Sequence, residues 1–121
     1  MKENKKGIGL KYAWTGLIIA FKQERNFRIH LVFTIIVLLF SFILKIKKIE
    51  WLFIIFAIAI VIISELINSV VERLIDYLKP ETHIQAKEIK DISASFVLIA
   101  VIIAGVTGLI IFLPKILIYI I

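Results

Sequence analysis

The stretch WLFIIFAIAIVIISELINSVVERLID, residues 51–76, decides the fold. Its first thirteen residues are apolar without interruption, and a helix needs roughly 20 mainly apolar residues to cross a bilayer. Polar residues begin at Ser64 and recur to Asp76 on one helical register. The stretch therefore predicts a transmembrane helix over residues 51–75, whose second half cannot face lipid.

Two further apolar runs predict the other spans, over residues 29–45 and 92–113. The second of these has the length of a spanning helix, and the first is short. Arg28 and Lys45 can extend the first span, because long cationic side chains reach outward to the interface.

The N-terminal region, residues 1–28, precedes the first span. Within residues 9–22, Lys11, Thr15 and Lys22 fall on one side of a helix and apolar residues fill the remainder. This pattern predicts an amphipathic helix lying in the cytoplasmic interface, and it has no signal-peptide cleavage pattern, so we expect it to be retained.

Two prolines mark the expected breaks. Pro80 separates the second helix from a polar loop within residues 73–90. Pro114 ends the third span, and residues 116–121 are too short to cross the bilayer again.

Composition and charge bound the class of protein. The chain has 121 residues, of which 61% are hydrophobic, so residues 1–121 form one membrane domain. It has no cysteine, which excludes thiol and zinc-thiolate chemistry, and no nucleic-acid-binding motif accompanies its net charge of +6. Eleven of the 15 Lys and Arg residues lie up to Arg28 or within residues 73–90, which predicts that both regions lie on the cytoplasmic side of the membrane.

A stripe of polar residues on the second span is the clearest functional signal. Glu65, Asn68, Glu72 and Asp76 follow the spacing i, i+3, i+7, i+11, an arc of about 80° on one helix face. A charge at the bilayer centre costs at least about 2.5–3.5 kcal/mol, so these residues must be near the interface, paired or bound to a cation. We interpret the stripe as functional, with a structural polar seam between helices as the alternative.

Two other polar clusters lie at the same cytoplasmic depth. Glu24 comes just before the first span, where it can meet Glu72. Two close carboxylates either raise the pKa of one of them or share a divalent cation, for which magnesium is suited. Lys87 and Lys90 come just before the third span, where they are available for phosphate; spacing alone favours an ordinary membrane-edge anchor for Lys90 and Asp91.

Together these clusters resemble the prokaryotic diacylglycerol kinase family over nearly the whole chain. The residues that carry the resemblance are, in order, Glu24, Phe27, Arg28, Glu65, Asn68, Glu72, Asp76, His83, Lys90 and Asp91. Residues 24–30, 50–53 and 107–115 are similar to the Gram-positive branch, whose members act as undecaprenol kinases. Ile18 and Ile84 differ from the better-known diacylglycerol kinase pattern, which carries polar residues there.

The resemblance implies an all-α membrane kinase that uses ATP and Mg²⁺ to phosphorylate a lipid hydroxyl, of undecaprenol or alternatively of diacylglycerol. Glu65 would be the general base and Asn68 would position the reacting groups. Glu24 and Glu72 would hold the metal. Lys90 would neutralise phosphate and Asp91 would orient it.

The remaining ATP contacts implied by the resemblance are Tyr12, His83 and Lys87. The resemblance also implies a homotrimer, whose active sites are shared between protomers. Ala100, Ala104 and Gly108 recur every four residues on the third span, as close helix packing in membranes prefers, either between protomers or within one chain.

Two other classes of function compete with the kinase. In a small ion or proton-coupled transporter, Glu65 and Glu72 would line an ion path, but residues 51–63 offer that path no polar group. A structural subunit of another membrane protein would not need carboxylates gathered at one depth. We interpret His30 as a packing residue at the headgroup level rather than as a ligand.

Overall fold

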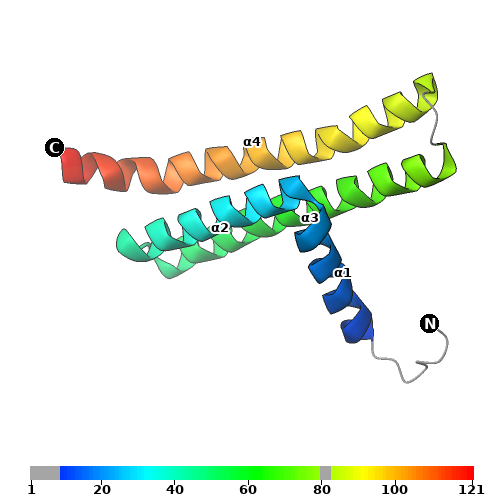
Figure 1. The fold of residues 1–121 in the computed structure, drawn as a ribbon. Helices are drawn as coiled ribbons and strands as arrows, with labels where there is room; N and C mark the ends of the chain where they lie inside the picture. The colour runs from blue at the N-terminus through cyan, green and yellow to red at the C-terminus, as the bar shows by residue number, and fades with distance from the viewer. Residues whose placement is uncertain (1–8, 80–82) are drawn as a thin grey trace.

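The computed structural model describes residues 9–79 and 83–121, and these form four helices (Figure 1). The helices are α1 (Gly9–Gln23), α2 (Arg25–Ile43), α3 (Lys48–Leu78) and α4 (Ile84–Ile120). Three of them, α2, α3 and α4, are long and apolar enough to cross a membrane. The predicted all-α membrane fold, a short N-terminal helix followed by three long ones, is confirmed.

A tight turn joins α2 to α3, and the two helices run side by side (Figure 1). Lys45 adopts a left-handed backbone conformation with φ of 51°, which reverses the chain. The Glu50 carboxylate accepts a hydrogen bond of 2.9 Å from the Lys47 backbone N–H and so satisfies one donor at the start of α3. Trp51 packs edge-to-face against Phe42, with ring centroids 5.0 Å apart. The turn is therefore held by both a cap and an aromatic pair.

α4 lies antiparallel to α3 and is fixed at both ends by ion pairs. Near the start of α4, Lys90 Nζ lies 2.5 Å from Asp76 Oδ1. Near its end, Lys115 Nζ lies 3.0 Å from Glu50 Oε1. A small apolar core forms at this second end, and its buried members are Ile46, Ile54 and Ile111.

α4 continues through Pro114 to Ile120, so the helix extends beyond the span predicted for residues 92–113. Pro114 has no N–H to donate, and only the carbonyl of Ile110 loses its usual partner. The next residue, Lys115, is anchored on Glu50, which keeps the helix end against α3. One missing hydrogen bond is thus offset by the ion pair.

The polar segment 73–90 is also mostly helical rather than a loop. α3 extends to Leu78 and α4 already begins at Ile84, where His83 Nδ1 accepts a hydrogen bond from the Gln85 backbone N–H. A side chain acting as N-cap explains why this helix starts before the apolar span. Pro80, the predicted break, lies outside the described residues.

α1 diverges from the bundle formed by the three long helices (Figure 1). Arg28 fixes this corner, because its Nη1 donates to the carbonyls of Phe21 and Lys22 at 2.8 and 3.2 Å. A cationic side chain on the last carbonyls of a helix satisfies acceptors that have no partner within the helix. The predicted interfacial helix therefore has its own end-cap, supplied by α2.

Small residues on α4 pack within the chain. Ala100 is only 2% exposed, and Ala104 and Gly108 face a hollow shared with α2 and α3. Large apolar residues elsewhere on α4, such as Leu98 and Leu109, are more than half exposed, as expected for a surface in contact with lipid. Within this chain, Ala100 is therefore buried by packing, whereas Ala104 and Gly108 border the hollow.

The ion pair between Lys115 and Glu50 should stabilise the end of α4. We expect Lys115→Met to lower the free energy of unfolding by about 1 kcal/mol, since the pair is mostly shielded and Glu50 keeps its bond to Lys47. The midpoint of thermal unfolding in detergent measures this. Lys48→Met, which removes a charge outside the ion pairs, is the control, and equal midpoints for the two variants would contradict the role.

Candidate active site

The second half of α3 buries a carboxylate. Glu65 is 3% exposed, and Asn68 and Ser69 beside it are each 5% exposed. The Ser69 hydroxyl donates to Glu65 Oε2 at 3.4 Å. The first half of the predicted polar stripe thus faces protein, with Glu65 its most buried residue, whereas Asp76 at its far end is exposed.

α2 contributes a histidine to this carboxylate. His30 Nε2 lies 3.5 Å from Glu65 Oε1, and the His30 side chain is 17% exposed. The distance is longer than an ordinary N–H···O hydrogen bond, so the contact is a close electrostatic one that a small movement shortens. The interpretation of His30 as a packing residue missed this contact, since it depends on how α2 is rotated against α3.

An arginine binds the carboxylate at the start of α2. Arg73 Nε donates to Glu24 Oε2 at 2.8 Å, and Arg73 Nη2 donates to Gln23 Oε1 at 2.6 Å. These contacts tie the junction of α1 and α2 to α3. Glu24, predicted to meet Glu72, is thus bound by the residue that follows Glu72 in the sequence.

Three carboxylates share this neighbourhood, because Glu24 and Glu72 both act electrostatically on Glu65. Glu72 makes no hydrogen bond or ion pair with the described residues, and Asn68 Oδ1 is buried without a hydrogen-bond partner. Across residues 9–79 and 83–121, no three acidic or histidine side chains converge into a closed metal site. A magnesium ion needs only one or two carboxylates when water and substrate phosphates complete its shell, so the donors present fit it.

The predicted phosphate-binding residues form ion pairs on the first turns of α4. Lys90 pairs with Asp76 on α3, while Asp91 pairs with Lys87 at 2.6 Å rather than with its neighbour. His83 caps the helix start, and Tyr12 lies apart from this group in sequence, on α1. The structure brings Lys90 to the end of the polar stripe and leaves Lys87 and Asp91 largely exposed.

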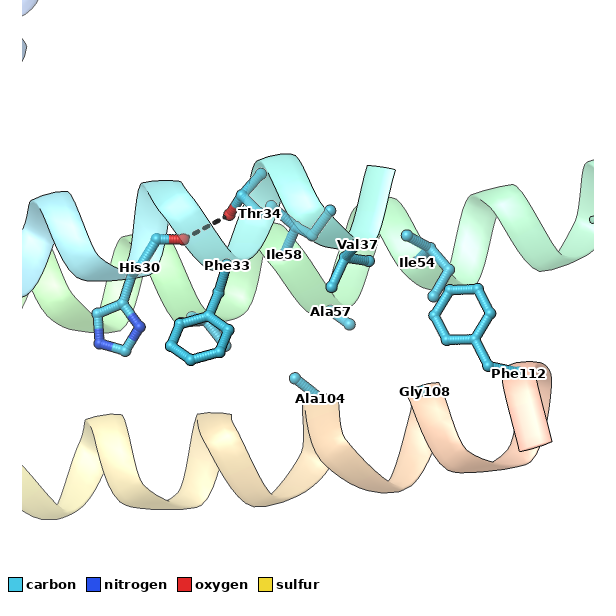
Figure 2. A pocket seen from close by; sticks show the side chains of 11 residues that line it. His30, Phe33, Thr34, Val37, Ile54, Ala57, Ile58, Ala104, Gly108 and Phe112 are labelled. Atoms are coloured by element: carbon cyan, nitrogen blue, oxygen red, sulfur yellow. Dashed lines mark hydrogen bonds between the residues drawn. The ribbon is translucent and has the colours of Figure 1, made fainter. Parts of the chain in front are cut away.

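A hollow of about 110 Å³ lies between α2, α3 and α4 (Figure 2). Its lining residues are His30, Phe33, Thr34, Val37, Ile54, Ala57, Ile58, Val61, Ala104, Gly108 and Phe112. His30 marks one end and Phe112 the other (Figure 2). Val61 is one turn before Glu65 on α3, so the hollow starts beside the buried carboxylate. The sequence did not predict this hollow, because the pattern along one helix does not show how three helices pack around a space.

Comparison with known proteins places these residues in a family. The family described as prokaryotic diacylglycerol kinase matches residues 11–112, which include every predicted site residue. The chain belongs to this family. It is 34% identical over 104 residues to the undecaprenol kinase of Bacillus subtilis (strain 168), covering 86% of this chain and 85% of that protein.

Two further relatives are diacylglycerol kinases. The one from Synechocystis sp. is 33% identical over 111 residues, covering 91% of this chain and 63% of that protein. The one from Haemophilus influenzae is 35% identical over 96 residues, covering 79% of this chain and 81% of that protein. The chain is therefore a multi-pass membrane protein and a lipid kinase, with ATP as the phosphoryl donor that a kinase implies. Membership of a kinase family decides against the transporter and structural-subunit alternatives.

The contact between His30 and Glu65 should support turnover. We expect His30→Ala to lower kcat by about 10- to 100-fold, because a loosely held carboxylate loses its reactive geometry. His30→Gln, which keeps a nitrogen at a similar reach, should recover part of the loss. Steady-state kinetics in mixed micelles measure kcat, and Ile29→Ala, a change on the exposed side of α2, is the control. Equal kcat values for His30→Ala and Ile29→Ala would contradict the role.

Proposed function

We propose that this lipid kinase transfers the γ-phosphoryl group of ATP to the hydroxyl of undecaprenol, giving undecaprenyl phosphate and ADP. The buried Glu65 carboxylate, inside a helix long enough to span the membrane, carries the proposal. An intramembrane carboxylate is functional by default, and a base at this depth is reached by an alcohol that lies in the bilayer.

Undecaprenol is favoured over diacylglycerol by two observations. One is the similarity to the undecaprenol kinase of Bacillus subtilis, which extends over most of both chains. The other is the apolar hollow beside Glu65, where the Thr34 hydroxyl already donates to the His30 carbonyl at 2.9 Å. A glyceride has polar ester groups next to its hydroxyl, whereas an isoprenoid alcohol has hydrocarbon there. Diacylglycerol is the second candidate, supported by the diacylglycerol kinases of similar identity.

In the proposed reaction, Glu65 takes the proton of the lipid hydroxyl as its oxygen attacks the γ-phosphorus. The bond between that phosphorus and the β–γ bridging oxygen breaks, and ADP leaves. Ser69 on α3 donates to one oxygen of Glu65, and His30 on α2 lies close to the other. Asn68 Oδ1, buried and unpaired, is placed to position the reacting groups.

The metal and nucleotide residues are part of the same proposal. Glu24 and Glu72 hold Mg²⁺, which when bound neutralises charge on the ATP phosphates. Arg73 keeps the Glu24 carboxylate in place near the stripe. Lys90 neutralises phosphate by exchanging its partner Asp76 for a phosphate oxygen, and Asp91 orients it.

Tyr12, His83 and Lys87 complete the proposed nucleotide contacts. We also propose that the chain acts as a homotrimer, in which a neighbouring protomer supplies groups that complete the open site. The distribution of Lys and Arg supports a cytoplasmic active site and N-terminus in a bacterial plasma membrane. Chemical cross-linking of the protein in detergent tests the trimer.

Replacing the proposed base tests the reaction. We expect wild type to transfer labelled γ-phosphate from Mg-ATP to undecaprenol in preference to diacylglycerol in mixed micelles. Glu65→Gln should lower kcat by about 10²–10⁴-fold, because the amide cannot accept the proton. Glu88→Gln, a change at an exposed carboxylate on α4, should behave as wild type. If the protein prefers diacylglycerol, then diacylglycerol and not undecaprenol is the substrate. If folded protein transfers phosphate to neither lipid, the proposal is wrong.

Replacing a proposed metal ligand tests the magnesium site. We expect Glu72→Gln to raise the Mg²⁺ concentration for half-maximal activity by about tenfold or more, since one of two carboxylate ligands is lost. Activity titrated against Mg²⁺ at fixed ATP measures this, with Glu88→Gln as the control for lost charge alone. An unchanged midpoint with a lower plateau would assign Glu72 a different role.

A further inference from the structure

The hollow between α2, α3 and α4 extends away from the proposed base along the bundle. On α2 its lining runs from His30 to Val37, which is about 10 Å of helix. At one end His30 Nε2 lies 3.5 Å from Glu65 Oε1, and the ring of Phe112 lies at the other end (Figure 2). It is therefore a partly open space that adjoins the proposed reaction centre at one end.

The lining chemistry restricts what the hollow can hold. Apart from the His30 ring and the Thr34 hydroxyl, every side chain that lines it is apolar, and the hydroxyl is already paired with a backbone carbonyl. Apolar cavities of about 150 Å³ stay dry and bind small hydrocarbons. At about 110 Å³, this one has room for a hydrocarbon segment of roughly one isoprene unit.

We propose that this hollow binds the isoprene unit next to the hydroxyl of the lipid substrate, so that the hydroxyl reaches Glu65 past His30. The inference rests on the proposed function and names the subsite that would select an isoprenoid alcohol. The rest of the isoprenoid leaves through the open side of the hollow, along exposed apolar helix faces that a bilayer would cover.

Two small residues on α4 create the space. A Cβ atom added at Gly108 would lie 3.8 Å from the Phe112 ring, which is an ordinary contact, so the helix accepts a side chain there. Because Gly108 lines the hollow, that side chain would extend into it. Ala104 lines the same wall one turn earlier. Gly105, on the same helix, lies outside the lining, and a Cβ there meets nothing within 4 Å. Gly108 and Gly105 are therefore a matched pair, because a side chain added at Gly108 fills part of the hollow and one added at Gly105 does not.

The experiment compares Gly108→Leu with Gly105→Leu. We expect Gly108→Leu to raise KM for undecaprenol by about 10- to 100-fold and to leave KM for ATP unchanged. A hydrophobic pocket that loses room for a methylene group or more binds its hydrocarbon ligand more weakly by about this factor. Gly108→Ala should show a smaller rise, and Gly105→Leu none. A polyprenol with a photoreactive group on its first isoprene unit, used without ATP, should label residues of the lining in wild type and not in Gly108→Leu.

The outcomes separate this inference from the proposed function. If wild type phosphorylates undecaprenol but the two leucine variants share one KM and one labelling pattern, the subsite is wrong and the function stands. If only Gly108→Leu changes the assembly size in detergent, a second copy of the chain fills the hollow and the subsite is again wrong. Labelling of the lining without phosphorylation would keep the subsite and overturn the function.

Discussion

A carboxylate inside a membrane helix is the constraint on which this structure depends. Glu65 is almost fully buried on α3, and an uncompensated charge there would be costly in the bilayer. Polar groups therefore gather around it, namely Ser69 on the same helix and His30 on α2. This grouping requires α2 and α3 to face each other at one rotation. The position of one acidic residue thus restricts how the first two long helices pack.

The bundle holds this arrangement mainly through its ends. Lys115 binds Glu50 at one end of the α3–α4 pair and Lys90 binds Asp76 at the other, with a small apolar core near the first. Between the ends, the small residues of α4 bring the helices close at Ala100 and leave space at Gly108. A chain with so few buried large side chains can keep a hollow beside the reaction centre, because ion pairs at the interfaces supply part of the alignment.

The sequence predicted the helices well and their mutual geometry less well. Apolar runs identified the spans, and the spacing of Glu65, Asn68 and Glu72 identified a polar face, since both are properties of single helices. The continuation through Pro114 was missed, because it depends on a contact with Glu50 that is distant in sequence. The contact of His30 with Glu65 and the hollow were missed for the same reason, since each needs the relative rotation of two or three helices.

Arg73 offsets part of the negative charge that gathers near the start of α2. Glu24, Glu65 and Glu72 place like charges near one another, which would push the helices apart. The guanidinium of Arg73 binds Glu24 and extends to Gln23, so it offsets one of these charges and fixes the start of α2. A cation bound by Glu24 and Glu72 would take over part of this neutralisation. The arginine therefore keeps the Glu24 carboxylate beside the polar stripe, while His30 and Ser69 flank Glu65.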